Sequence, residues 1–242
     1  MNRVGPIVVV ISLLAASGAS AQSLSLDLGD GGSITATTLN LIALITVLSI
    51  APGIVVTVTC FPFIVTVMSI LRQAIGLQQS PPNMLIISIA LFLTFFVMEP
   101  VLLDSWEQGV RPLLDGEVEV EEGFQRGFEP FRIFMAAQVD PDTFATMARI
   151  RSDLNLTEAN PDTPLSVLIS TFLLSELSRA FQVGFLIFLP FLIIDLVVAA
   201  VLMSMGMMMV PPAIVSLPFK LAFFVVANGW ALVAESLVRS YN

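Results

Sequence analysis

The chain alternates between long apolar stretches and shorter polar breaks. Apolar residues dominate four stretches, at 39–71, 84–103, 164–203 and 213–238. A helix of about twenty apolar residues is long enough to cross a bilayer. Prolines interrupt the first stretch at Pro52 and Pro62, and each is expected to end or bend a helix because proline lacks the amide N–H. The pattern predicts an all-α, membrane-associated protein made of helical hairpins.

Two of the breaks contain a double proline between apolar helices. The first is polar, and its turn residues are Gly76, Gln78, Gln79, Pro81 and Pro82. The second joins the last two apolar stretches and contains Gly206, Pro211 and Pro212. Irregular backbone is tolerated at membrane depth only where protein buries it or where it lines a water-filled path. The two turns therefore indicate either a transport pathway or apolar helices that are buried against copies of themselves.

The last two apolar stretches carry opposite charges at matching positions. Asp195 lies twelve residues before Met207, and Lys220 lies twelve residues after Met208. A hairpin folded between these methionines would place the two charges almost level. An unpaired charge in such surroundings costs several kcal/mol, so the spacing predicts an ion pair. Glu176 and Arg179 are three residues apart and can pair on one helix face. The alternative for these four residues is a proton relay.

The turn between the two arms, residues 205–210, is rich in methionine. We call this segment the methionine turn, and its methionines are Met205, Met207, Met208 and Met209. Ordinary turns are polar, whereas methionine is unbranched and deformable and fills irregular space. A soft apolar turn followed by two prolines suits a constriction better than an ordinary connection.

Composition supports a membrane protein with one hydrophilic part. Hydrophobic residues make up 56% of the chain and charged residues 12%, and the mean hydropathy is +0.93, whereas soluble domains have about 25% charged residues. Residues 104–163, the acidic insert, hold thirteen of the nineteen acids but five of the ten bases. The insert is predicted to form two or three small helices, one of them capped by Asp140.

The first 21 residues are typical of a cleavable signal peptide. Arg3 supplies the positive start, 7–16 form a short apolar core, and Ala19-Ser20-Ala21 fits a cleavage site. The alternative is an uncleaved first helix. The chain is thus predicted to comprise a signal peptide at 1–21, a polar segment at 22–38, apolar helices at 39–103, the acidic insert at 104–163 and a C-terminal hairpin at 164–242.

Several kinds of chemistry are excluded by what the sequence lacks. It has no histidine and one cysteine, Cys60, so histidine-ligated metal sites and the common nucleophile–histidine pairs are absent. It has no phosphate-binding glycine loop, and its basic residues are too few and scattered to bind nucleic acid. We predict neither enzymatic activity nor a cofactor or metal.

Two blocks of sequence resemble the FliP family, the flagellar members of the type III secretion export-gate proteins. The first is GLQQSPPN at 76–83, which leads into ALFLTFFVM at 90–98. The second runs from PFLIID at 190–195 through MSMGMMMVPP at 203–212 to LPFKL at 217–221. The similarity covers nearly the whole chain after the signal peptide. One departure is Asn228, where the family leads us to expect an aspartate.

The resemblance implies a ring of about five copies that forms a gate with FliQ-like and FliR-like membrane subunits. FlhA-like and FlhB-like proteins would be further partners. Unfolded flagellar substrates would pass through this gate at the inner membrane, in the flagellar basal body. The methionine turn would be the gasket of the pore, and membrane lipid would contact the assembly. Glu176 and Lys220 become candidates for contacts between copies, which competes with an Asp195–Lys220 pair.

Two other functions remain open at this point. Injectisome export-gate subunits are similar in the same blocks. A small-solute secondary transporter could use Asp195, Glu176 and Lys220 as coupling residues, although such carriers usually show internal repeats. Arg72 favours a cytoplasmic first turn by the positive-inside rule, which would place the acidic insert on the periplasmic side.

Overall fold

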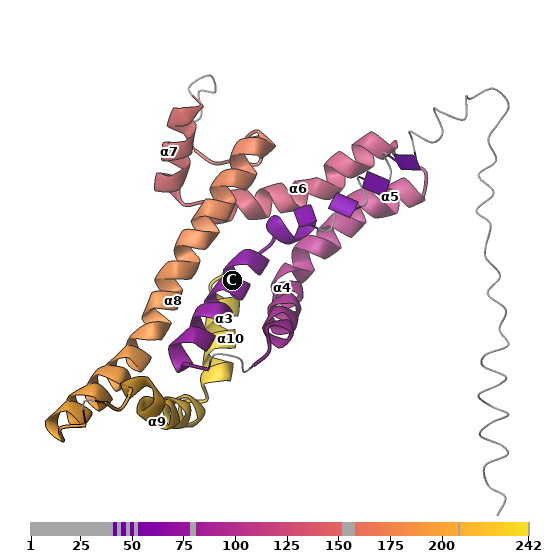
Figure 1. Ribbon diagram of the computed structural model, residues 1–242. Coiled ribbons are helices and arrows are strands. Elements are labelled where there is room, and N and C mark those ends of the chain that lie inside the picture. Colours follow the sequence, from indigo (N-terminus) through magenta and orange to yellow (C-terminus); the bar gives the residue numbers. More distant parts are fainter. Residues whose placement is uncertain are drawn as a thin grey trace, which may run out of the picture. The chain divides into compact units, whose positions relative to one another are not determined.

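The computed structural model describes most of the chain beyond residue 40 (Figure 1). The described residues are 41–42, 45–46, 49–50, 53–77, 81–151, 158–207 and 209–241. The predicted signal peptide and polar segment, with Gln78, Gln79 and Met208, lie outside them. The chain divides into two units, 1–48 and 49–242, and the description below concerns the second. Its described residues are helical and contain no strand, so the predicted all-α class is confirmed.

Helix α3, Phe61–Ile75, is the centre of this unit. Pro62 lies in its first turn, where the missing N–H costs nothing, so this proline begins a helix instead of bending one. The buried face of α3 carries Phe63, Ile64, Val67, Met68 and Leu71, which is the spacing of an amphipathic helix. Helix α3 lies between α4 and α8 and contacts both (Figure 1).

Helix α4, Asn83–Ser105, is longer than the sequence predicts. It runs through Pro100 and continues as a π-helical turn, η1 at Trp106–Val110, and a short helix, α5 at Arg111–Leu114. Its buried positions are Ile86, Ala90, Thr94 and Met98. Because these lie every fourth residue, one narrow stripe of α4 packs on the protein, and its other faces expose large apolar side chains.

The acidic insert forms η1, α5 and two further helices, α6 at Val120–Gln138 and α7 at Pro141–Ile150. Helix α6 crosses η1 at Gly109 and Gly127, where a Cβ added to Gly109 would lie 2.4 Å from the Gly127 Cα. Asp140 caps α7 by accepting a hydrogen bond from the Thr143 amide at 2.8 Å. The Thr143 hydroxyl and amide bonds lower the pKa of Asp140. The cap at Asp140 agrees with the sequence prediction, and the described part of the insert is helical, but the 19-residue α6 is longer than the small helices predicted.

The C-terminal part consists of one long helix and a bent pair. Helix α8, Leu165–Ser204, packs along α3 and meets α9, Pro212–Val226, near its end. Helix α10, Gly229–Arg239, is bent by 62° from α9. The bend lies at Asn228, whose φ is +50°, and asparagine adopts this left-handed conformation more readily than most residues.

Length and composition make two of the described helical segments candidates to cross a membrane. These are 83–114 and 165–204, and the bent pair α9–α10 adds a third if it is one span. Helix α3 is apolar but has 15 residues. The four apolar stretches of the sequence therefore correspond to two or three candidate spans among the described residues.

Candidate functional site

The α8–α9 hairpin brings Asp195 and Lys220 together. The Nζ of Lys220 lies 2.6 Å from Asp195 Oδ2. The Lys220 side chain is 7% exposed and that of Asp195 is 35% exposed. The two charges therefore face each other at the depth that their equal distance from the methionines predicts, and the aspartate is the more exposed partner.

Two further groups complete this cluster. Ser216, one turn before Lys220 on α9, donates a hydrogen bond from its hydroxyl to Asp195 Oδ1 at 2.5 Å. The Lys220 ammonium donates a second hydrogen bond to the carbonyl of Ala74, at 3.0 Å. Both carboxylate oxygens of Asp195 thus have partners. The cation contacts α3, α8 and α9 together.

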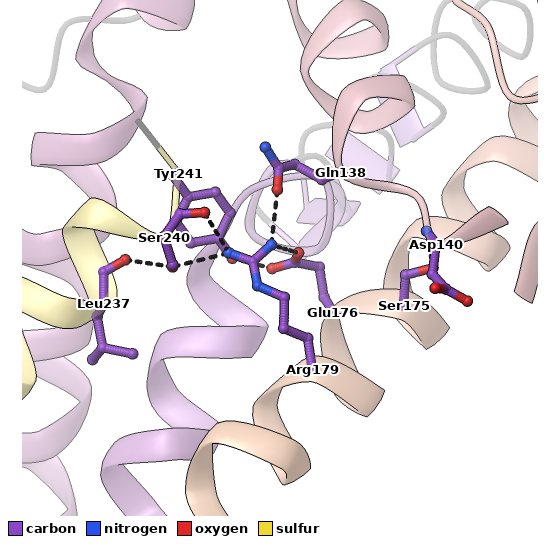
Figure 2. Close-up of polar contacts among 8 residues, drawn as sticks. All are labelled: Gln138, Asp140, Ser175, Glu176, Arg179, Leu237, Ser240 and Tyr241. Atoms are coloured by element: carbon purple, nitrogen blue, oxygen red, sulfur yellow. Dashed lines mark hydrogen bonds and ion pairs between the residues drawn. The ribbon is translucent and has the colours of Figure 1, made fainter. Parts of the chain in front are cut away.

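A second polar cluster is built around Glu176 and Arg179, which lie nearer the N-terminus of α8 than Asp195. Figure 2 shows this cluster. Glu176 is fully buried, and its Oε1 accepts a hydrogen bond from Arg179 Nη1 at 3.2 Å. Its Oε2 accepts a hydrogen bond from the hydroxyl of Tyr241. A buried charge is tolerated only when it is paired and hydrogen-bonded, and here both carboxylate oxygens are satisfied.

Arg179 joins four segments of the chain. Figure 2 shows its guanidinium reaching toward Gln138 on α6 and Ser240 after α10. It donates to Gln138 Oε1 at 2.8 Å and to the Ser240 carbonyl and hydroxyl at 2.8 and 2.9 Å. Its Cζ lies 4.7 Å from the ring centre of Phe63 on α3 and 4.5 Å from that of Tyr241. Cation–π contacts of this kind add to the hydrogen bonds.

Tyr241 is the only tyrosine in the sequence. Burial raises the pKa of its phenol, and the neighbouring Glu176 carboxylate raises it further. The hydroxyl therefore keeps its proton and remains a donor to Glu176. Its ring also stacks with Phe134 and meets Phe63 edge to face, so the tyrosine ties the residues after α10 to the core.

The methionine turn begins where α8 ends in a glycine cap. The amide of Gly206 donates to the Met203 carbonyl at 3.1 Å and that of Met207 to the Leu202 carbonyl at 3.0 Å. This pair of bonds is a Schellman motif, which needs a left-handed residue, and Gly206 has φ +73°. The turn ends at Val210, Pro211 is the N-cap residue of α9, and Pro212 is the first residue of that helix.

The described methionines of the turn are exposed to different degrees. Met205 is 67% exposed, Met207 41% and Met209 98%. Met205 and Met207 border an apolar pocket of ≈ 570 Å³ between α8 and α9, which Leu202, Val215 and Phe219 also line. The turn thus presents soft apolar side chains at the closed end of the hairpin, where α8 is joined to α9.

The first double-proline turn lies between α3 and α4. Gly76 caps α3 with φ +88°, and Pro82 directly precedes the first residue of α4. A Cβ added to Gly76 would lie 3.6 Å from Leu217 Cδ1 and 4.0 Å from Lys220 Nζ. The described end of this turn therefore lies against the Asp195–Lys220 cluster. Within the described residues no group of three His, Cys, Asp or Glu could hold a metal ion.

The arrangement also contains partners that the sequence does not predict. They are Ala74, Gln138, Ser216, Ser240 and the hydroxyl of Tyr241. Ser216 lies four residues before Lys220, on the same helix face, and this spacing could have indicated it. The carbonyl of Ala74 and the contacts of 240–241 depend on how the helices cross, which the local pattern does not encode.

The chain is similar to the proteins of one known family over most of its length. The model of the FliP family matches residues 44–237. The chain belongs to the FliP family. Its FliP relatives include proteins named flagellar biosynthetic protein FliP from Caulobacter vibrioides, 51% identical over 96% of this chain and 90% of the relative, and from Agrobacterium fabrum, 46% identical over 98% of each. The namesake from Bacillus subtilis is 44% identical over 84% of this chain and 92% of the relative.

The residues matched by the FliP family model include both charge clusters, apart from Ser240 and Tyr241. Asp195, Lys220, Glu176 and Arg179 lie inside the matched residues, as does the methionine turn. Ser240 and Tyr241 lie beyond residue 237. Membership in FliP makes this chain a membrane protein of a non-enzymatic family, in agreement with its composition and with the sequence prediction.

Proposed function

We propose that this chain is an export-gate subunit of the flagellar type III secretion apparatus. Copies of it would form a ring in the inner membrane, together with FliQ-like and FliR-like subunits. Unfolded flagellar substrates would leave the cytoplasm through that ring. The flagellar branch, and not the injectisome branch, is supported because the relatives above are named as flagellar proteins.

The observation that carries the proposal is the exposed methionine turn at the end of a charge-clamped hairpin. An export channel must pass extended chains of many compositions and still retain ions when idle. Methionine side chains can part around a polypeptide and close again without a specific contact to it. Met205, Met207, Met208 and Met209 are thus the proposed gasket, and the Asp195–Lys220 pair fixes the helices on either side.

The second cluster has a structural role in this proposal. Glu176, Arg179 and Tyr241 satisfy one another within a single copy, and Lys220 is engaged by Asp195. These contacts favour structural pairing over a solute or proton relay. The acidic insert would lie on the periplasmic side, since Arg72 favours a cytoplasmic turn after α3.

The test is to replace Met207, Met208 and Met209 together with alanine. We expect the purified particle to keep its mass, with several copies and two small partner proteins, while membranes that contain it become permeable to ions. Met84→Ala is the matched control, because Met84 is also a methionine with an exposed side chain, 81%, but lies on α4. Ion tightness equal to that of the unsubstituted protein would disprove the gasket. A monomer without partners would disprove the ring.

A further inference from the structure

The Lys220 ammonium holds the end of α3 as well as balancing Asp195. Its hydrogen bond to the Ala74 carbonyl reaches one of the last carbonyls of that helix, which lack partners inside the helix. A positive charge there also matches the negative end of the helix dipole. One buried cation therefore caps α3 and pairs with α8, although it belongs to α9.

This cluster leaves little room for its members to move independently. Ser216 is fully buried, and Lys220, taken as a whole residue, is 5% exposed. Ser216 holds the Asp195 oxygen that does not face Lys220, so the carboxylate is fixed from two sides. The side chain of Leu217 and the Lys220 ammonium lie against Gly76, the residue that ends α3.

The two helices that carry the methionine turn both pass through the cluster. Asp195 lies nine residues before the end of α8, and Lys220 lies eight residues after the start of α9. These are helical lengths of roughly 12–14 Å at about 1.5 Å per residue. Both segments are continuously helical, and α9 continues through Pro218, so a displacement at the cluster is carried along them toward the turn.

We propose that Lys220, Asp195, Ser216 and the Ala74 carbonyl form a joint that couples the end of α3 to the methionine turn. Movement of the α3 C-terminus would shift α9, and with it the turn, as one body. The inference rests on the proposed function only in regarding the turn as the closure of a pore. The coupling itself is a property of the described contacts.

The experiment measures two distances within one copy by spin labelling. In a Cys60→Ala background, labels at Gln73→Cys and Ala213→Cys, both exposed positions, report the separation of α3 from α9. Labels at Leu196→Cys and Ala213→Cys report the separation of α8 from α9 within the hairpin. Labelled chains are diluted into unlabelled ones, and distances are measured in the purified particle. We expect one narrow distribution for each pair.

Two substitutions separate the joint from the ion pair. Lys220→Gln should broaden both distributions. The exchange Asp195→Lys with Lys220→Asp restores opposite charges in the hairpin but places a carboxylate against the Ala74 carbonyl. It should leave the hairpin distribution narrow and broaden the α3–α9 distribution. Glu235→Gln, which breaks an exposed pair with Arg239 on α10, is the control and should change neither.

An α3–α9 distribution that stays narrow in either variant would overturn the joint. If neither variant assembles, Lys220→Arg provides the test. Its guanidinium keeps the positive charge but is larger than the ammonium, so the mean α3–α9 distance should shift. An unchanged mean would overturn the proposal as well. The result is independent of the gasket test: if the distances respond but the methionine variants stay ion-tight, the joint stands and the closure is elsewhere.

Discussion

At the scale of single residues, the buried polar groups of this apolar chain satisfy one another. Among the described residues, no buried side-chain nitrogen or oxygen lacks a hydrogen-bond partner. Glu176 is the clearest case, since its two oxygens are held by Arg179 and Tyr241. Leaving a buried group unpaired costs about 1–3 kcal/mol, and more for a charged group, so each partner contributes more than its own contact suggests.

Tyr241→Phe tests the contribution of one such partner, because it removes a single hydroxyl group. The change removes the hydroxyl that donates to Glu176 and leaves a buried carboxylate oxygen unpaired, so we expect a loss of roughly 1–3 kcal/mol in stability. The measurement is chemical unfolding in detergent. Glu176→Gln and the double variant complete a thermodynamic cycle. If the two losses simply add, the hydrogen bond makes no contribution of its own.

At the scale of helices, close crossings depend on residues without side chains. Helix α6 meets η1 with Gly109 against the backbone of Gly127. The Ser105 hydroxyl donates to the Gly127 carbonyl at 2.6 Å across the same crossing. Packed helix axes normally lie about 8–10 Å apart, and a glycine pair allows the backbones themselves to touch.

Gly109→Ala should therefore separate α6 from η1. Its Cβ would overlap backbone atoms of Gly127, which cannot move aside as a flexible side chain could. We expect faster amide hydrogen exchange in α6 and a lower unfolding temperature. Gly53→Ala is the matched control, since nothing lies within 4 Å of the added Cβ. Equal exchange rates in the two variants would mean that the crossing tolerates a methyl group.

At the scale of the whole molecule, the two charge clusters connect segments that are distant in the sequence. Arg179 joins α8 to α3, α6 and the residues after α10. Lys220 joins α9 to α8 and to the end of α3. Large apolar side chains, meanwhile, are exposed along α4 and along the C-terminal half of α8. The unit is thus held together by its polar centres as well as by its apolar core.

Arg179→Ala should be among the most destabilising single changes in the described residues. It leaves the fully buried Glu176 without its cation, and breaking a buried pair in this way costs about 3–5 kcal/mol. Arg179→Lys should restore little of this loss, because lysine lacks the planar fork that serves four acceptors and stacks on two rings.

The measurement is the unfolding midpoint of the three proteins in one detergent. Arg239→Lys is the control, since Arg239 is 77% exposed and pairs with Glu235 on the surface of α10, where ion pairs contribute about 0–1 kcal/mol. Full rescue by lysine at position 179 would show that charge alone is needed there.

The class of the protein and much of its local structure follow from the sequence alone. Long apolar runs require helices, since these satisfy their own backbone groups, and the structure is helical throughout its described part. Prolines and glycines mark ends that follow local backbone preferences, as at Gly206 and Pro212. The sequence also predicted that Asp195 and Lys220 lie at the same distance from the turn, because each is twelve residues from a central methionine and both helices of a hairpin rise equally per residue.

Which groups meet across helices, by contrast, depends on how the helices pack. Pro100 lies inside α4, which continues past it and into a π-helical turn. The contacts of Lys220 with the Ala74 carbonyl and of Tyr241 with Glu176 join residues 146 and 65 positions apart. No local pattern encodes such pairs, since they depend on the angles at which whole helices cross and on the glycines that allow close approach.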